Sequence, residues 1–464
     1  MHRDGVFQSV CIVFLWLLCG VQPTVAGTIV VDPSGGGDFQ QIAPAIESAA
    51  DGDTVLILSG TYDGPLNRDI LVELKDLVIR SESGPASAII DCERQGRGFH
   101  VSGADATPIL EGLTVCNARV DTCGAGVLCD EGAAPEFVDC VFRDNEARGD
   151  WPSGTGGGVY AANHGGVRFV DCEFIANIAD CGGGIYLGPG DADIIGCFFQ
   201  DNYAEVSGGA VLCDEDSAAT IRDCLFDQNY GRYGGGLCCE RANPHVEATT
   251  FFWNRASRGA GILCTTSSPT IVDCDFLTNG ASSTGGGIHC AGGSSPIVTS
   301  CVFTNNWGVW GGGGVECGVM CRPTFENVTF FWNRAGYPGG AIAVPSPTAA
   351  PTFTRCIIAY TQSGGAMNCD AGADPVIREC AVFGNIDSNL LCGDYDDIIY
   401  SDILFCDVPD RDVTLCADSP CLPENNPWGV LIGARGQGCG ACSTPVQSVS
   451  WGVIKAMYRE GAAP

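Results

Sequence analysis

The chain has very few basic residues. Its 464 residues include 23 lysines and arginines against 55 aspartates and glutamates, which gives a net charge of −32. Only two of the basic residues, Lys75 and Lys455, are lysines. A surface with this excess of negative charge repels the phosphates of nucleic acids and of anionic lipids. The composition therefore argues against a nucleic-acid-binding protein and against a protein that lies on anionic membranes.

The sequence also lacks an apolar run of the roughly 18 residues that cross a bilayer. The longest run, Val10 to Leu18, follows the basic Arg3 and precedes Thr24-Val25-Ala26. These are the three parts of a secretory signal peptide, so we expect no membrane span, cleavage after Ala26 and a secreted or cell-surface location.

Export makes disulfides possible. Loss of Cys11 and Cys19 would leave 27 of the 29 cysteines, so at least one thiol stays unpaired within the chain.

A helical period is absent from most of the chain, and a repeat takes its place. A Gly-Gly-Gly-aliphatic unit, with Ala for one Gly in some copies, recurs at steps of 25 to 32 residues; the copies begin at Gly124, Gly156, Gly182, Gly208, Gly234, Gly259, Gly285, Gly312, Gly339 and Gly364. Each copy continues with a second unit of the form Cys-x-Phe-x-x-Asn, as in Cys224 to Asn229. Uniform apolar positions alternate with variable ones, which is typical of short strands with one buried face.

The repeat length selects the fold class. A propeller blade needs about 40 residues or more, and leucine-rich repeats lack these glycines and asparagines. Two or three short strands in about 25 residues fit one rung of a parallel β-helix, in which like residues stack about 4.8 Å apart. We predict an all-β parallel β-helix solenoid with irregular first coils, about ten regular rungs, an N-terminal helical cap and a Cys/Pro-rich C-terminal cap.

The asparagines that end the second unit form one column, made of Asn145, Asn177, Asn202, Asn229, Asn254, Asn279, Asn306 and Asn333. Inward amides in a turn can hydrogen-bond the backbone and the amides above and below them. We therefore interpret this column as a structural ladder rather than as a binding site.

Composition shifts divide the chain into a signal peptide, the N-terminal cap with first coils, the ten-copy repeat region, the C-terminal cap and a tail: 1–26, 27–123, 124–392, 393–442 and 443–464. The spacing of Ile42, Ala45 and Ile46 predicts a helix over the first rung. In the C-terminal cap, a disulfide between Cys416 and Cys421 is sterically plausible. The tail either packs on this cap or is read by export machinery.

Cysteines occupy two columns of the repeat. Five copies hold both cysteines, five lack one and none lacks both, which argues against obligatory bridges within a rung. Bridges between rungs are strained, because side chains in register run parallel. We predict that most of these cysteines are free thiols that pack as small apolar groups.

The segment from Asp38-Phe39-x-x-Ile42 to Gly60-Thr61-Tyr62 resembles the start of pectin-lyase-like right-handed parallel β-helix proteins. That family includes pectinesterases, polysaccharide lyases and non-enzymatic secreted proteins. The Gly-Gly-(Ala/Ile/Val) and Phe-x-x-Asn units are similar to the repeats of polymorphic outer-membrane proteins, which are adhesins and autotransporters. The resemblance covers roughly residues 28–392 and implies a right-handed helix, but one fold hosts many activities.

Catalytic signatures of the pectin-lyase-like family are missing. The characteristic sequence motifs of this family are absent, and Lys75 and Lys455 fall in the predicted cap and tail. The histidines are spread over different rungs: His100, His164, His245 and His289. Hydrolysis with inversion needs only carboxylates on neighbouring rungs, and acidic residues are plentiful. A polysaccharide hydrolase or lyase that uses Asp or Glu of adjacent rungs therefore stays open as the alternative.

Aromatic residues beside the asparagine column favour a binding function: Tyr203, Tyr230, Trp253, Trp307, Trp310 and Trp332. Such rings could stack on sugars, or they could simply cover the turn of the rod. The acidic clusters at 214–216 and 394–397 could bind Ca²⁺ weakly; otherwise we expect no metal or cofactor. We predict an exported, non-catalytic binding or adhesion rod that recognises polysaccharide, a cell-surface glycan or a surface partner, in an oligomeric state left open.

Overall fold

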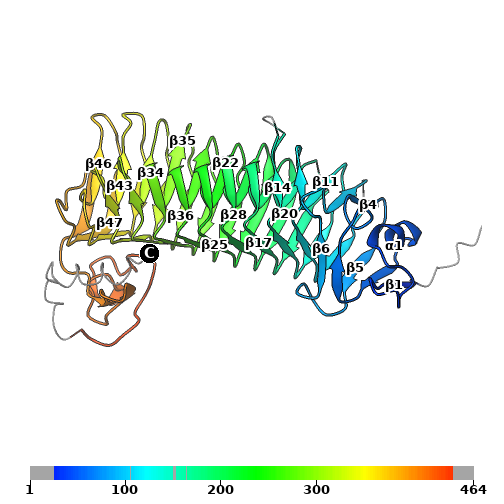
Figure 1. Cartoon of the computed structure of the whole chain (residues 1–464). Coiled ribbons are helices and arrows are strands. Elements are labelled where there is room, and N and C mark those ends of the chain that lie inside the picture. The colour runs from blue at the N-terminus through cyan, green and yellow to red at the C-terminus, as the bar shows by residue number, and fades with distance from the viewer. Residues whose placement is uncertain (1–25, 105, 150–152, 164, 443–464) are drawn as a thin grey trace, which may run out of the picture.

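The computed structural model describes residues 26–104, 106–149, 153–163 and 165–442. The predicted tail and all but the last residue of the predicted signal peptide lie outside this part. The chain winds into a long parallel β-helix with the helix α1 at one end and a small C-terminal module near the other (Figure 1). The predicted solenoid class is confirmed.

The regular turns contribute strands to three parallel sheets, here called A, B and C. In one turn, β24 (Ser217–Arg222) and β25 (Leu225–Asp227) join sheet A, β26 (Tyr230–Tyr233) joins sheet C and β27 (Leu237–Glu240) joins sheet B. Sheet C has nine strands: β10 (Arg119–Val120), β14 (Glu146–Ala147), β18 (Ile178–Cys181), β22 (Tyr203–Ser207), β26 (Tyr230–Tyr233), β30 (Arg255–Arg258), β34 (Gly280–Thr284), β38 (Trp307–Gly308) and β42 (Arg334–Ala335).

Sheet B has twelve strands: β4 (Ile70–Glu73), β7 (Phe99–Ser102), β11 (Val127–Asp130), β15 (Val159–Ala161), β19 (Ile185–Leu187), β23 (Val211–Asp214), β27 (Leu237–Glu240), β31 (Ile262–Thr265), β35 (Ile288–Ala291), β39 (Val315–Cys317), β43 (Ile342–Val344) and β46 (Met367–Cys369). Val211, Leu237 and Ile262 are register partners on successive strands and are fully buried. The inward column therefore stacks as the repeat predicts.

Sheet A takes the largest number of strands, 27: β1 (Thr28–Val31), β2 (Thr54–Ile57), β3 (Gly60–Tyr62), β5 (Val78–Ser81), β6 (Ala88–Asp91), β8 (Ile109–Glu111), β9 (Thr114–Cys116), β12 (Glu136–Val138), β13 (Val141–Arg143), β16 (Val167–Val170), β17 (Glu173–Ile175), β20 (Gly190–Ile195), β21 (Phe198–Gln200), β24 (Ser217–Arg222), β25 (Leu225–Asp227), β28 (His245–Glu247), β29 (Thr250–Phe252), β32 (Thr270–Val272), β33 (Asp275–Leu277), β36 (Ile297–Thr299), β37 (Val302–Thr304), β40 (Thr324–Glu326), β41 (Thr329–Phe331), β44 (Thr352–Thr354), β45 (Ile357–Ala359), β47 (Val376–Phe383) and β48 (Asp394–Ile399).

The core is a set of stacked columns. The phenylalanines of the second repeat unit, from Phe142 to Phe330, stack with ring centroids 4.4 to 5.0 Å apart. At the N-terminal end, α1 (Ile42–Ser48) buries Ile42, Ala45 and Ile46 against the same core. The helix thus covers the first turns with apolar side chains, as its spacing predicts.

The asparagine ladder is present over all eight predicted members. The amide nitrogens of the first seven members donate to the Oδ1 of the next asparagine at 3.0 to 3.1 Å, and all eight side chains are buried. Each Oδ1 of the members after Asn145 also accepts the backbone N–H of the asparagine one turn earlier. The ladder thereby satisfies backbone groups of the turn between sheets A and C that no strand pairs.

The glycine triplet makes the turn from sheet C to sheet B. Gly234 has a φ of 65°, a conformation that a residue with a Cβ rarely adopts. At Gly235 an added Cβ would meet the carbonyl oxygens of Arg255 and Ala260 one turn further on. The triplet therefore permits close contact between successive turns.

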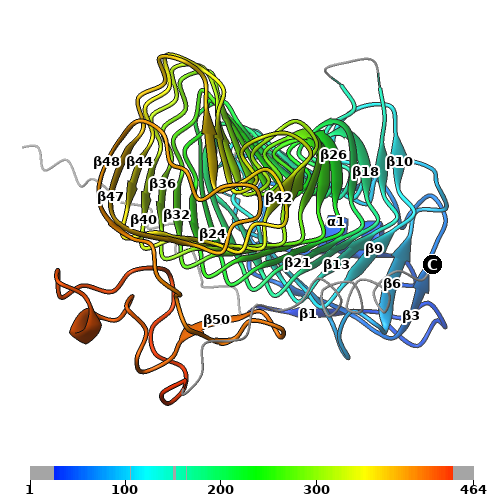
Figure 2. The ribbon, with the colours of Figure 1, turned by 90° about the vertical axis from the view of Figure 1, so that its left-hand side faces the viewer.

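The C-terminal module packs against the side of the rod. The hairpin of β49 (Phe405–Asp407) and β50 (Asp412–Leu415) and the short 3-10 helix η1 (Pro423–Asn425) belong to this module. An apolar cluster joins it to the outer face of sheet A, and it includes Phe331 and Ile357 on the rod and Ile403 and Ile432 in the module. Figure 2 shows the module, in orange and red, beside this face.

Arg435 anchors the module further along the rod. Its Nη1 lies 2.7 Å from an Asp273 oxygen and its Nη2 lies 2.8 Å from an Asp275 oxygen. Both aspartates precede the apolar cluster by at least one turn, so the module spans several rungs.

Three disulfides staple the C-terminal part: Cys369–Cys392, Cys406–Cys439 and Cys416–Cys442. The proposed bridge between Cys416 and Cys421 does not occur, since Cys421 is a free, buried thiol. The intervening residues form a turn in which Ser419 donates its N–H to the Cys416 carbonyl and its hydroxyl to Ile403. Asp418 accepts the N–H of Cys442 at 2.9 Å, which brings that cysteine back to Cys416.

Most column cysteines are free thiols, as predicted, with Cys369 as the exception. The structure holds 21 free cysteines among its described residues, and all except Cys123 are buried. Burial raises the pKa of the Cys92 thiol to about 12 and that of Cys140 well above its usual value. Buried, protonated thiols are poor nucleophiles, so the folded core resists disulfide exchange.

The ladder predicts a specific loss of stability. In Asn254→Ala, the Phe226 carbonyl and the Asn229 N–H lose their partners at 2.9 and 3.0 Å. Buried groups left without hydrogen bonds cost about 1–3 kcal/mol each, so we expect a loss of about 3 kcal/mol in the free energy of unfolding. Guanidinium unfolding followed by circular dichroism measures this loss. Asn243→Ala, at an exposed position, should cost less than about 1 kcal/mol; equal losses would contradict the ladder's role.

The thiols predict a difference between native and denatured protein. Without reductant, a thiol reagent should titrate one cysteine, Cys123, rapidly in the native state and 21 cysteines in denaturant. Fewer than about six thiols in denaturant would mean that the columns are bridged, in conflict with the strain expected for parallel side chains.

Candidate functional site

The outward column of sheet C carries aromatic and basic side chains. Register pairing aligns Arg119, Glu146, Ile178, Tyr203, Tyr230, Arg255, Gly280, Trp307 and Arg334 along the rod. The rings of Tyr203 and Tyr230 stack with centroids 5.2 Å apart, and the two side chains are 37% and 44% exposed. They therefore offer an apolar surface to solvent.

Trp253 and Trp307 extend this surface. Trp253 precedes the ladder residue Asn254 and is exposed, with the Arg255 guanidinium 5.9 Å from its ring. The indole of Trp307 lies over Gly280, because glycine leaves the space that a Cβ would fill. We call Tyr203, Tyr230, Trp253, Arg255 and Trp307 the sheet C ridge. It unites four of the six predicted aromatics.

The other two predicted aromatics lie elsewhere. Trp332 is buried under the C-terminal module, where it stacks on Phe331 and lies beneath the Arg411 guanidinium. This position is equivalent to Trp253 in the repeat, but the module covers it, so Trp332 is not part of a free surface. Trp310 is exposed and stacks on Tyr337 at 4.9 Å.

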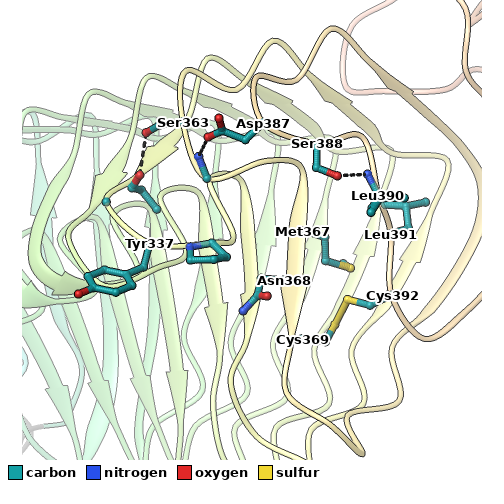
Figure 3. A pocket seen from close by; sticks show the side chains of 14 residues that line it. Tyr337, Ser363, Met367, Asn368, Cys369, Asp387, Ser388, Leu390, Leu391 and Cys392 are labelled. Atoms are coloured by element: carbon teal, nitrogen blue, oxygen red, sulfur yellow. Dashed lines mark hydrogen bonds between the residues drawn. A yellow bond between two sulfur atoms is a disulfide. The ribbon is translucent and has the colours of Figure 1, made fainter.

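A pocket of about 600 Å³ opens at the C-terminal end of sheet B, beside Tyr337. We call it the end pocket; its lining comprises Ala335, Gly336, Tyr337, Pro338, Ser363, Gly364, Met367, Asn368, Cys369, Asp387, Ser388, Leu390, Leu391 and Cys392 (Figure 3). On earlier turns, Val206 and Tyr233 cover the outward residues Leu212 and Cys238 of sheet B. At the end pocket, the turns contribute small residues such as Ala335, Gly336 and Gly364, so the outward face of sheet B stays uncovered there.

Several polar groups of the end pocket are held by the backbone. Asp387 accepts the Gly364 N–H at 2.8 Å, and the Ser363 hydroxyl donates to the Ala335 carbonyl at 2.7 Å. The Asn368 amide makes no hydrogen bond to any other described residue. Its donors and acceptor are therefore available to a ligand, and the volume falls within the range of small-molecule sites.

A second group of polar residues lies on the outer side of sheet B. Asp214 and Glu240 are register partners on adjacent turns, and Arg241 bonds Asp214 at 3.0 Å and Glu215 at 2.9 Å. The Tyr186 hydroxyl donates to Asp214 at 3.1 Å, and the Ser207 hydroxyl donates to Glu240. Carboxylates on adjacent rungs thus exist, but each is already bonded to side chains of the chain itself.

Candidate metal ligands meet only in the C-terminal module, as far as the described residues go. The two groups are Cys406 with Cys416 and Cys439, and Cys416 with Asp418 and Cys442. All these cysteines belong to disulfides. The acidic clusters at 214–216 and 394–397 form no such group within the described part of the chain.

The sequence patterns give no sign of a buried ionisable pair on sheet B. His289 and Glu316 are register partners, 5% and 7% exposed, with Nδ1 and Oε1 3.5 Å apart. The Thr284 hydroxyl lies 3.1 Å from the same Nδ1. Desolvation, aided by the Arg258 charge, lowers the pKa of His289 to about 4, and desolvation raises that of Glu316 to about 7. Between these values both side chains are neutral.

Comparison with known proteins agrees with the fold. A family model described as a right handed beta helix region matches residues 156–330, so the solenoid is a right-handed parallel β-helix. The metabotropic glutamate receptor-like protein R of Dictyostelium discoideum is 27% identical over 155 aligned residues, which cover 27% of this chain and 9% of that protein. The alignment therefore spans a small part of that relative.

Solved structures with a similar course include polysaccharide lyases. A family 6 alginate lyase has a TM-score of 0.48 at 12% identity, and the match covers 81% of this chain and 53% of the lyase chain. A family 6 polysaccharide lyase from Pseudopedobacter saltans has a TM-score of 0.44 at 11% identity, and the match covers 91% of this chain and 97% of the lyase. A pectate lyase has a TM-score of 0.39 at 12% identity, and the match covers 89% of this chain and 97% of the lyase.

The buried pair predicts opposite pH dependences for two variants. The raised pKa of Glu316 costs stability as pH rises from 4.5 to about 7, whereas the lowered pKa of His289 costs stability as pH falls from 6.5 to about 4. Relative to the wild type, Glu316→Gln should gain about 3 kcal/mol from pH 4.5 to 7. His289→Gln should be more stable than the wild type by a similar amount at pH 4, and this difference should disappear as the pH rises to 6.5. Denaturant unfolding at four pH values measures both, and parallel curves for all three proteins would contradict the assignment.

Proposed function

We propose that the chain is an exported, non-catalytic β-helix protein that binds a polysaccharide or cell-surface glycan. The observation that carries the proposal is the end pocket beside the exposed Trp310 and Tyr337 rings. Sugar rings present apolar C–H faces that pack on aromatic rings. The amide of Asn368 and the carboxylate of Asp387 can exchange hydrogen bonds with hydroxyls at the edge of such a ring.

The composition of the end pocket supports binding over hydrolysis. Hydrolysis of a glycosidic bond uses two carboxyl groups on either side of that bond. Asp387 is the single carboxylate among the lining residues of this pocket. Asp214 and Glu240 lie on other turns and are engaged by Tyr186, Arg241 and Ser207.

Two independent features support export. The sequence of residues 1–26 has the three parts of a signal peptide. Three disulfides in the C-terminal part suit an oxidising compartment. In the described residues there is no helix with the length and apolar character of a membrane span. A rod outside the cell would present its end pocket to extracellular glycans.

A double variant of the end pocket tests the proposal. Tyr337→Ala with Asn368→Ala removes one stacking surface and one hydrogen-bonding group, so affinity should fall by about 2 kcal/mol, or ~thirtyfold. The wild type is first screened on an oligosaccharide array, and the affinity for the retained glycans is then measured by calorimetry.

The matched control is Tyr395→Ala with Asn243→Ala, because both residues are exposed and lie outside the pocket. The control should bind as the wild type does. Absence of any retained glycan, or equal binding by both double variants, would refute the pocket. Release of reducing ends or unsaturated products would instead show the carbohydrate-active enzyme.

A further inference from the structure

On two adjacent strands of sheet C, three exposed arginines have no carboxylate oxygen of a described residue within 4.0 Å. Ten arginines of the described part of the chain form ion pairs with carboxylates, for example Arg68, Arg241 and Arg435. Arg232, Arg255 and Arg258 are exposed, and no carboxylate oxygen among the described residues lies within 4.0 Å of them. In a protein of net charge −32, three neighbouring arginines without a carboxylate partner need another explanation.

The three arginines occupy two adjacent strands. Arg232 lies on β26, and Arg255 and Arg258 lie on β30, where they are the register partners of Tyr230 and Tyr233. The Arg232 guanidinium lies 5.4 Å from the Tyr233 ring centroid. Arg255 is placed similarly over Trp253. We call Arg232, Arg255 and Arg258 the arginine cluster.

Contact with a ring leaves the guanidinium able to bind an anion. The cation–π attraction acts through the face of the guanidinium or its edge, while its N–H groups form a fork that matches a carboxylate or a similar oxyanion. Bidentate, charge-assisted hydrogen bonds of this kind are stronger than neutral ones. Arg232 and Arg255 are therefore held in place by aromatic side chains and can still donate hydrogen bonds outward.

The cluster also adjoins the stacked tyrosines of the sheet C ridge. Tyr230 is the register partner of both Tyr203 and Arg255, so a sugar ring on the tyrosine pair has a guanidinium one strand away. A ligand that combines a ring with an anionic substituent would use both features at once. Neutral sugars would use the rings alone and leave the arginines unpaired.

We infer that the sheet C ridge and the arginine cluster together bind an anionic glycan, one that carries carboxylate or sulfate groups. This inference rests on the proposed glycan-binding function, but it concerns a different face from the end pocket. It assigns a charge to the ligand. The shared chemistry is an oxyanion on a sugar ring, and the test separates carboxylate from sulfate.

The experiment uses the full chain with three polymers: polygalacturonate, dextran sulfate and neutral dextran. Affinity electrophoresis at about 0.15 M salt suits the question, because the Debye length is then about 8 Å and distant charges are screened. The wild type should be retarded by at least one anionic polymer more strongly than by dextran. Which polymer retards it identifies carboxylate or sulfate as the recognised group.

Two triple variants change the net charge equally. Arg232→Gln, Arg255→Gln and Arg258→Gln together should weaken binding of the anionic polymer about tenfold. The control combines Arg80→Gln, Arg222→Gln and Arg322→Gln, all exposed and outside sheet C, and should bind within about twofold of the wild type. A third variant, with lysine at all three cluster positions, keeps the charge, loses the fork and should show intermediate affinity.

Several results would overturn the inference. Equal loss in both glutamine variants would mean that binding depends on net charge alone. Retardation by neutral dextran alone, or by none of the polymers, would mean that the cluster selects no anion. Thermal unfolding of each variant checks that the fold is kept. Since the end pocket is tested by Tyr337→Ala with Asn368→Ala, failure of the cluster variant leaves that result unaffected.

Discussion

The hydrogen-bonded column of buried asparagines holds successive turns in one register. Each amide from Asn145 to Asn306 joins its own turn to the next at 3.0 to 3.1 Å, and each amide from Asn177 to Asn333 bonds a phenylalanine carbonyl of an earlier turn, as Asn254 does with Phe226. Apolar columns alone specify register weakly, since one aliphatic side chain packs on another with little direction. An amide in a buried turn has fixed donors and acceptors, so a slipped turn would leave polar groups unpaired. The positions of all three sheets depend on this constraint.

Fixed register converts a sequence repeat into a surface pattern. One position per turn becomes a line of side chains about 4.8 Å apart, so substitutions at one repeat position define a stripe on the rod. The sheet C ridge arises because the position after the ladder asparagine is Tyr203, Tyr230, Arg255 and Trp307 in different turns. The end pocket lies where small residues such as Ala335, Gly336 and Gly364 line the rod beside Tyr337. Function can therefore vary along the rod without any change in the core.

The repeats predict contacts between neighbouring turns well, because those contacts involve residues about 25 positions apart in a common pattern. The sheet register, the ladder and the free thiols are of this kind. Contacts of the C-terminal module are not, as with Asn327, whose amide donates to the Leu431 carbonyl 104 residues away. Burial of Trp332 and the bridge from Cys416 to Cys442 depend on how this module folds back.

The aromatics that the sequence analysis groups together lie only in part on one face. Four of the six aromatics share the sheet C ridge because they follow one turn of the repeat. The outward positions of sheet B are variable in sequence, yet several of them are buried, including His289 and Glu316. Tyr337 and Asn368 belong to different turns, so periodicity alone does not bring them together.

When an acidic protein binds an acidic polymer, the attraction at the contact must outweigh the long-range repulsion between their net charges. The net charge of −32 repels a polyanion at distances beyond a few ångströms. At physiological salt that repulsion decays over about 8 Å, whereas direct contact with a guanidinium fork is little affected by the distant charges. Some carboxylates of the chain are paired within it, as Asp214 is with Arg241, which reduces their field locally. Selectivity for an anionic ligand can thus come from a few arginines whose neighbours are aromatic, while the remaining surface discourages non-specific binding of other polyanions.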